Sequence, residues 1–273
     1  MDPYESIRRF FREQAAAAPE PPMPAALVAE MPAVDLTEET DLTVLRPGGQ
    51  LLTEGQYFII EYKDASGRSS VRRISVYAVK ASGTGIPALM AKCHERNAAR
   101  CFRLDRISSV FDHDGIAIEP LSAFYRDAFG LRWPVPGLVF EDPDIPANRK
   151  TLVRDVCRRR GVVLLAALAL ADRELCDDEI GVILDACAEW CEVEKIELSQ
   201  DEVASLSGYV RRLRPTPEAV EKATERLITE QPENIRSMLS WGVRVIEADG
   251  FLHHREVSLL NEISRELTGI SAV

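Results

Sequence analysis

The chain has 273 residues, 46% of them hydrophobic, and a formal net charge of -11 at pH 7. This length holds one large domain or two ordinary ones, and the hydrophobic content is typical of globular proteins. The acidic net charge argues against general nucleic-acid binding by the whole chain. Residues 57–110 nevertheless carry 10 Lys and Arg against 4 Asp and Glu, whereas residues 161–273 carry 11 against 22. This asymmetry predicts two domains with different partners.

The N-terminal part, residues 1–49, is predicted to be a short helix followed by a flexible tether. A helix over residues 4–14 places Ile7, Phe10 and Phe11 on one side, which could dock on the protein itself, on a partner or on a membrane surface. Residues 15–47 are rich in proline, alanine and acidic residues, a composition typical of a partly polyproline tether.

Residues 50–118 have the pattern of short strands. The segments 57–62 and 71–79 are rich in aromatic and β-branched residues and flank a turn that contains Gly67. Further strands are predicted at 89–93, 100–110 and 116–118, and this spacing favours a small sheet or barrel. Residues 119–148 are rich in proline and acidic residues, which predicts a second linker with a short helix at 122–130.

Residues 149–273 are predicted to be helical throughout. One long helix is expected over 149–172, and others over 177–192, 232–249 and 254–267. Two more helices are marked by start signals, the capping box Ser199-x-x-Glu202 and the N-cap Thr216 followed by Pro217. Six helices with short connections predict a compact all-α bundle, so the fold class is α+β multidomain.

The cysteines and the apolar runs bear on the location of the protein. Six cysteines are scattered singly without a C-x-x-C pair, and the N-terminus has no secretory apolar region. These features predict reduced thiols and a cytoplasmic protein. The longest apolar run, residues 162–171, is too short to span a bilayer, so no transmembrane segment is expected.

The stretch Cys93–Val110 contains three arginines spaced three apart, Arg100, Arg103 and Arg106. In an extended strand Arg100 and Arg103 face opposite ways, and a bend after Leu104 is needed to bring Arg106 to another arginine. Clustered guanidinium groups favour an anion or a set of carboxylates among them. The stretch therefore predicts an anion-binding site, with a solvated strand face, neutralised by Asp105, as the structural alternative.

Two helix junctions in the second half resemble each other. Ala171-Asp172 is followed by Glu179, and Ala248-Asp249 is followed by Glu256, at an offset of 77 residues. This echo predicts a duplicated helical hairpin. The four acids could form a divalent metal site, which His253 and His254 could extend toward a transition metal. Alternatively, they cap helix N-termini, where negative charge is favourable.

Residues 57–115 resemble the WYL domain, a small SH3-like or Sm-like β-barrel of bacterial regulators. The stretch 100–107 is close to the family's R-x-F-R-L-D-R-I signature, and Tyr62, the turn 64–67 and the strand 71–77 also match. Pro87-Ala88-Leu89 replaces the Trp-Tyr-Leu tripeptide, and a Pro-rich segment stands where a winged helix-turn-helix usually precedes the barrel. The resemblance implies sensing of nucleotides or single-stranded nucleic acid through basic and aromatic residues, here Arg73, Arg100, Arg103, Arg106, Tyr62 and Tyr77.

Residues 150–270 are similar to the tellurite-resistance TerB-like helical domain. The similarity depends on the two junctions, and it implies a possible divalent metal at Asp172, Glu179, Asp249 and Glu256. Arg173 stands where the family usually has glycine. This domain is the one expected to bind a protein partner.

Three functional hypotheses follow. The first is a non-enzymatic bacterial stress or defence regulator, in which the barrel senses an anionic ligand and the helical domain binds a partner or metal. The second is a protein–protein interaction scaffold without a small ligand, in which the basic barrel pairs with acidic surfaces such as the helical half. An enzyme is disfavoured because Gly83-Thr-Gly85 lacks the third glycine and the lysine of a phosphate loop, and no nucleophile–base signature is present.

Overall fold

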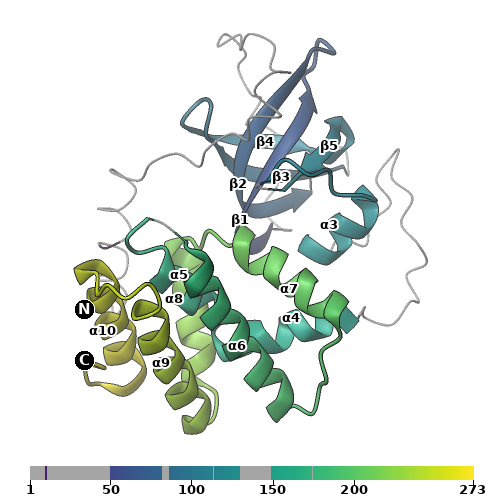
Figure 1. The fold of residues 1–273 in the computed structure, drawn as a ribbon. Coiled ribbons are helices and arrows are strands. Elements are labelled where there is room, and N and C mark those ends of the chain that lie inside the picture. Colours follow the sequence, from purple (N-terminus) through teal and green to yellow (C-terminus); the bar gives the residue numbers. More distant parts are fainter. Residues whose placement is uncertain (1–9, 11–49, 82–85, 113, 130–148, 174) are drawn as a thin grey trace. The chain divides into compact units, whose positions relative to one another are not determined.

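The computed structural model describes residue 10 and residues 50–81, 86–112, 114–129, 149–173 and 175–273. The chain divides into two compact units, one formed by Met1–Pro19 with Ala147–Val273 and the other by Glu20–Pro146 (Figure 1). We call them the helical unit and the sheet unit. A five-stranded sheet in one and helices in the other confirm the predicted α+β architecture. The predicted tether and most of the second linker lie outside the described residues.

The sheet unit contains one antiparallel sheet with the strand order β4-β3-β2-β1-β5. Its strands are β1 (Gln50–Lys63), β2 (Ser69–Ala81), β3 (Pro87–Cys93), β4 (Ala98–Arg103) and β5 (Ile107–Phe111). The predicted strand over 100–110 is interrupted by the 3-10 helix η1 (Leu104–Arg106), which supplies the expected bend. The predicted strand over 116–118 is wrong, since only an isolated bridge between Ala117 and Phe111 forms there.

One face of the sheet is covered by helix α3 (Leu121–Phe129). The side chain of Phe58 on β1 meets the rings of Phe124 and Phe129 edge to face, with ring centroids 4.9 and 5.8 Å apart. Alternate residues of the strands, such as Ile74 and Leu89, complete this core. The helix predicted at 122–130 is therefore present, as α3, and it packs on the sheet instead of lying in a linker.

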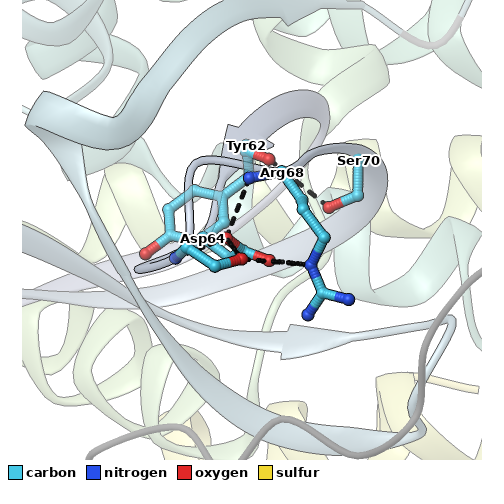
Figure 2. Close-up of polar contacts among 5 residues, drawn as sticks. Tyr62, Asp64, Arg68 and Ser70 are labelled. Carbon is cyan, nitrogen blue, oxygen red and sulfur yellow. Dashed lines mark hydrogen bonds and ion pairs between the residues drawn. The ribbon is translucent and has the colours of Figure 1, made fainter.

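The β1–β2 hairpin is closed by the side chain of Asp64 (Figure 2). Its Oδ1 accepts hydrogen bonds from the backbone N–H groups of Ser66 and Arg68, at 2.7 and 2.9 Å. Its Oδ2 accepts from Arg68 Nε at 3.0 Å. On the strand side of the turn, Ser70 Oγ donates to the carbonyl oxygen of Tyr62 at 3.4 Å. The turn thus fixes the end of β1, where Tyr62 lies.

Asp64→Ala is expected to destabilise this hairpin by about 1 kcal/mol, because two turn N–H groups lose their acceptor. Asp64→Asn is the matched control. It keeps an acceptor oxygen and loses only the ion pair with Arg68, whose side chain is exposed. Hydrogen exchange of the β1 and β2 amides measures both effects. A control that costs as much as the alanine variant would show that the ion pair, and not the turn, stabilises the hairpin.

The helical unit is built around one fully buried helix. Every residue of α5 (Val162–Ala169) is buried. Around it pack α4 (Arg149–Arg160), α6 (Asp177–Val193), α8 (Pro217–Ile228), α9 (Pro232–Ile246) and α10 (His254–Thr268), while α7 (Gln200–Arg212) packs on α4 and α6. Phe10, the described residue of the predicted N-terminal helix, is helical and packs against this core. None of the helices in the described ranges is long and apolar enough to cross a membrane.

The single helix predicted over 149–172 is wrong, because Gly161 separates α4 from α5. Gly161 has φ 108° and ψ 22°, a left-handed conformation that side chains disfavour. A Cβ atom on Gly161 would lie 2.7 Å from Cγ of Met238, so α9 packs against the break. Two predicted start signals are confirmed: the Ser199 side chain accepts from the Glu202 N–H at 3.3 Å, and the Thr216 side chain from the Ala219 N–H at 3.2 Å.

Candidate functional site

Arg73, on β2, is paired with a carboxylate. Its Nε forms an ion pair with Glu95 Oε1 at 2.7 Å, and its backbone N–H donates to Glu95 Oε2 at 2.9 Å. Both side chains are largely buried, so the carboxylate neutralises the guanidinium in place. Arg73 is thus already paired with Glu95, and its role in ligand binding stays a prediction.

Arg100 and Arg103 lie on opposite faces of β4, as the alternation predicts. Arg100 pairs across the sheet with Ala91, whose side chain belongs to the core beneath α3. Arg103 pairs with Ala88, on the other face. The arginine stretch is thus divided between the two faces.

Arg103 donates two hydrogen bonds to the carboxylate of Asp105. Arg103 Nε donates to Asp105 Oδ1 at 3.0 Å and Nη2 donates to Oδ2 at 2.7 Å. This bidentate pair raises the pKa of Arg103 above its usual value, chiefly through the hydrogen bond with Asp105. Both side chains remain partly exposed, at 32% and 21%. The Asp105 carboxylate of the structural alternative is therefore paired with Arg103. Because the pair is partly exposed, an anion could compete with Asp105 for Arg103.

Lys80 lies in the same cross-strand row of paired residues as Arg103. Lys80 on β2 pairs with Ala88 on β3, and Ala88 pairs with Arg103 on β4. The Cβ atoms of neighbours in such a row are about 5 Å apart, so the Cβ atoms of Lys80 and Arg103 are about 10 Å apart, one on either side of Ala88. Ala88, which carries only a methyl group, is buried. Both flanking side chains are long enough to meet over it.

Tyr62 connects this row to Arg106. Its hydroxyl hydrogen-bonds with the Arg106 guanidinium and with the backbone N–H of Arg103, and its ring meets Phe102 edge to face at 5.2 Å. Burial raises the pKa of Tyr62, and the contacts with Arg106 and Arg103 offset only part of that increase. The phenol is therefore a neutral hydrogen-bonding group between two arginines.

Cys101 and Tyr77 complete the group. Burial raises the pKa of the Cys101 thiol, while the charges of Lys80 and Arg103 oppose the increase. Burial, and then Cys101, raise the pKa of Tyr77, which lies at a β-bulge between Val76 and Ala78. Lys80 and Cys101 were not predicted from the sequence, because only the strand register places Lys80 in the row of Arg103. We call the following six residues the cationic cluster: Tyr62, Tyr77, Lys80, Cys101, Arg103 and Arg106.

In the helical unit, the two similar junctions lie next to each other. Asp172 follows α5 and Asp249 follows α9, and His253 lies between them. The His253 Nε2 atom is 3.7 Å from Asp172 Oδ2 and 3.4 Å from Asp249 Oδ2. Glu179 and Glu256 stand in the first turns of α6 and α10 and are almost fully buried. We call these five residues the acidic junction.

The two glutamates of the acidic junction act as helix caps. Glu179 Oε2 accepts from the Cys176 N–H at 2.8 Å, and Glu256 Oε2 accepts from the His253 N–H at 3.4 Å. Within the described residues, no group of three or more His, Cys, Asp or Glu side chains is arranged to hold a metal ion. The capping alternative is thus confirmed for Glu179 and Glu256, while the metal site and the TerB-like resemblance stay predictions.

Comparison with known proteins bears on the sheet unit. No curated protein matches the chain. Among solved structures, the chain is similar to the proteasome accessory factor B/C (PafBC) of Arthrobacter aurescens, with 12% sequence identity and a TM-score of 0.20, too low to support an argument. That likeness covers 98% of this chain and 56% of the other, so the chain spans about half the length of that protein. Residues 49–111, which contain all five strands described here, match the family model of the WYL domain.

Proposed function

We propose that the chain is a non-enzymatic bacterial regulatory protein of the cytoplasm whose sheet unit senses an anionic ligand at the cationic cluster. The ligand is a nucleotide or a single-stranded nucleic acid, and the helical unit passes its binding on to a protein partner in a stress or defence response. The match of residues 49–111 to the WYL domain supports a sensing role. The local excess of basic residues over 57–110 supports an anion as the ligand.

The observation that carries the proposal is the row Lys80–Ala88–Arg103 beside Arg106 and Tyr62. Arg103 is flanked by Lys80 in this row and by Arg106 through Tyr62, so a phosphate bound to Arg103 could receive charge-assisted hydrogen bonds from more than one side. Ala88 belongs to the Pro-Ala-Leu that stands where the family carries Trp-Tyr-Leu, so a methyl group takes the place of a tyrosine ring between two cations. Tyr77, which is half-buried, offers a ring for a base to stack on, worth about 1–3 kcal/mol per base.

A ligand must compete with Asp105 for Arg103. The pair is partly exposed, and exposed ion pairs contribute at most about 1 kcal/mol, so an added phosphate can displace or share the carboxylate. Removing the charge of Asp105 should then favour the ligand. Binding should also weaken steeply with added salt, because neutralised phosphates release counterions.

Arg103→Ala and Arg106→Ala are each expected to weaken binding of ATP and of an oligothymidylate by about tenfold or more, because each removes charge-assisted hydrogen bonds. Asp105→Asn is expected to strengthen binding by up to about fivefold. Arg68→Ala is the matched control, since Arg68 is also an exposed arginine paired with an aspartate, but at the hairpin turn. Isothermal titration of the full chain at two salt concentrations measures these effects. Unchanged affinity in both arginine variants would reject the cationic cluster as the site.

The interaction scaffold remains the second candidate, and the carboxylates that already neutralise Arg73 and Arg103 favour it. In this function the cationic cluster pairs with an acidic protein surface and takes no small ligand. Asp105→Asn would then strengthen binding to polyglutamate, a simple acidic probe, and leave ATP and oligothymidylate unbound. A titration with the three probes side by side distinguishes the two functions.

A further inference from the structure

Helix α4 carries a concentration of positive charge in a unit that is otherwise acidic. It contains six Lys and Arg residues against one acid, Asp155, whereas residues 161–273 contain 11 against 22. Three of these cations are four residues apart, namely Lys150, Arg154 and Arg158, so their side chains form one stripe along the helix. The stripe extends over about 12 Å, because an α-helix rises about 1.5 Å per residue.

Helix α7 packs beside this stripe. At the start of the two helices, Arg149 Nε lies 2.6 Å from Glu202 Oε1. Further along, the guanidinium carbon of Arg154 lies 5.8 Å from the centre of the Tyr209 ring. The two helices therefore run in the same direction, and the stripe lies on the side of α4 that faces α7. Arg154 itself is 6% exposed, and a guanidinium at such a depth favours a negatively charged group beside it.

Arg212 adds a fourth cation from α7. It follows Tyr209 by three residues, so the two side chains are neighbours on that helix. A Cβ atom on Gly208 would lie 3.0 Å from Arg212 Nη1, so the guanidinium lies over this glycine. Because the helices run in the same direction, Arg158 and Arg212 each lie about one turn beyond the contact between Arg154 and Tyr209. We call the following four residues the α4–α7 stripe: Lys150, Arg154, Arg158 and Arg212.

The ion pair of Arg158 lies at the surface of the helical unit. Arg158 Nη1 is 3.3 Å from Oδ1 of Asp155, which precedes it by three residues on α4. Arg158 is partly exposed and Asp155 is exposed, and such surface pairs contribute little to stability. A carboxylate from another molecule can therefore compete with Asp155. Arg211, which precedes Arg212, has a different role, because its Nη2 lies 2.7 Å from Asp177 Oδ1 and links α7 to α6.

We propose that the α4–α7 stripe is a docking surface for a short acidic segment of a partner protein. In an extended segment, alternate side chains lie on one side and are about 6–7 Å apart. Side chains four residues apart on α4 are about 6 Å apart along the helix. Successive carboxylates of such a segment can therefore meet Lys150, Arg154 and Arg158 in turn, while Arg212 approaches from α7. The contacts are charge-assisted hydrogen bonds, which a guanidinium group forms in pairs with a carboxylate.

The charge of the surrounding unit favours a short acidic peptide over a nucleic acid. After α4, the helical unit carries 22 acids against 11 Lys and Arg, and their field repels a long polyanion. A segment of a few residues covers only the stripe and avoids that repulsion. This inference names the chemistry of the partner that the proposed function assigns to the helical unit. It does not depend on ligand binding by the sheet unit.

Fluorescence anisotropy of the full chain with a fluorescein-labelled peptide of alternating Glu and Ser residues tests the docking surface. Arg158→Gln and Arg212→Gln are each expected to weaken binding by about three- to tenfold, because each variant loses charge-assisted hydrogen bonds with the peptide. Asp155→Asn is expected to strengthen binding by about two- to threefold, because a competing carboxylate is removed. This gain in affinity cannot result from a folding defect. Unchanged affinity in both glutamine variants, or no gain in Asp155→Asn, would overturn the proposal.

Two control variants separate the stripe from other positive charges. Arg236→Gln removes an arginine of α9 that also pairs with an acid three residues earlier, Glu233, at 3.4 Å. Arg103→Ala removes an arginine of the cationic cluster. Both should keep the wild-type affinity for the peptide. A loss in Arg236→Gln equal to that in Arg158→Gln would indicate general attraction to positive charge and overturn the proposal. So would a loss confined to Arg103→Ala, which would place the peptide on the sheet unit. If Arg158→Gln weakens binding of an oligothymidylate and not of the peptide, the stripe is a nucleic-acid site and the proposal is wrong.

Discussion

Gly161→Ala is expected to destabilise the helical unit by about 3 kcal/mol. The left-handed conformation of Gly161 costs a residue with a Cβ about 1–2 kcal/mol. The new methyl carbon would also lie 2.7 Å from Cγ of Met238, a fully buried side chain, and such overpacking typically costs about 1–3 kcal/mol. Both costs fall on the break between α4 and α5, where the chain turns into its most buried helix.

Gly181→Ala is the matched control for this variant. Gly181 lies in the exposed interior of α6 with nothing within 4 Å of its Cβ position, so alanine should stabilise the unit by about 0.5–1 kcal/mol. Guanidinium unfolding followed by tryptophan fluorescence reports on the helical unit through buried Trp190 and Trp241. In a Met238→Ala background, Gly161→Ala should destabilise the unit less, because the contact with Met238 is absent. The cost of the left-handed conformation should remain. A Gly161→Ala variant as stable as the wild type would mean that the break between the helices is not fixed by this glycine.

Phe58→Ala is expected to destabilise the sheet unit by about 3–5 kcal/mol and to release α3 from the sheet. Phe58 is 1% exposed, and its ring stands between those of Phe124 and Phe129. The variant loses the buried area of the ring, leaves a cavity and removes two edge-to-face contacts. Since Phe58 lies four residues before Tyr62 on β1, the cationic cluster should lose order together with α3.

Phe58→Leu is the companion variant, because leucine fills most of the space and should cost about 1–2 kcal/mol. Hydrogen exchange of the α3 and β1 amides distinguishes detachment of the helix from general unfolding. If the α3 amides of Phe58→Ala stay as protected as in the wild type, the helix is held by contacts other than this aromatic group.

The two candidate sites have opposite charge. The cationic cluster contains Lys80, Arg103 and Arg106, with Asp105 paired to Arg103. The acidic junction brings His253 close to Asp172 and Asp249 and uses Glu179 and Glu256 as helix caps.

The sequence by itself determined the elements whose signals are local. The capping box at Ser199, the Thr216-Pro217 start and the alternation in β1 and β2 depend on side chains within a few residues of one another. For the same reason the α+β fold class and the opposite directions of Arg100 and Arg103 could be predicted. The sequence also showed the repeated motif of the two junctions, whereas their meeting at His253 depends on tertiary packing.

The tertiary structure decided what depends on residues that are distant in sequence. The break at Gly161 is fixed by Met238, and the row of Lys80 with Arg103 exists only because β3 lies between their strands. The ion pair of Arg73 with Glu95 also joins residues 22 positions apart in the sequence. The charge on a glutamate likewise depends on burial and on neighbours that no local pattern reveals, which is why Glu202 and Glu179, alike in sequence, differ in the sign of their pKa shift.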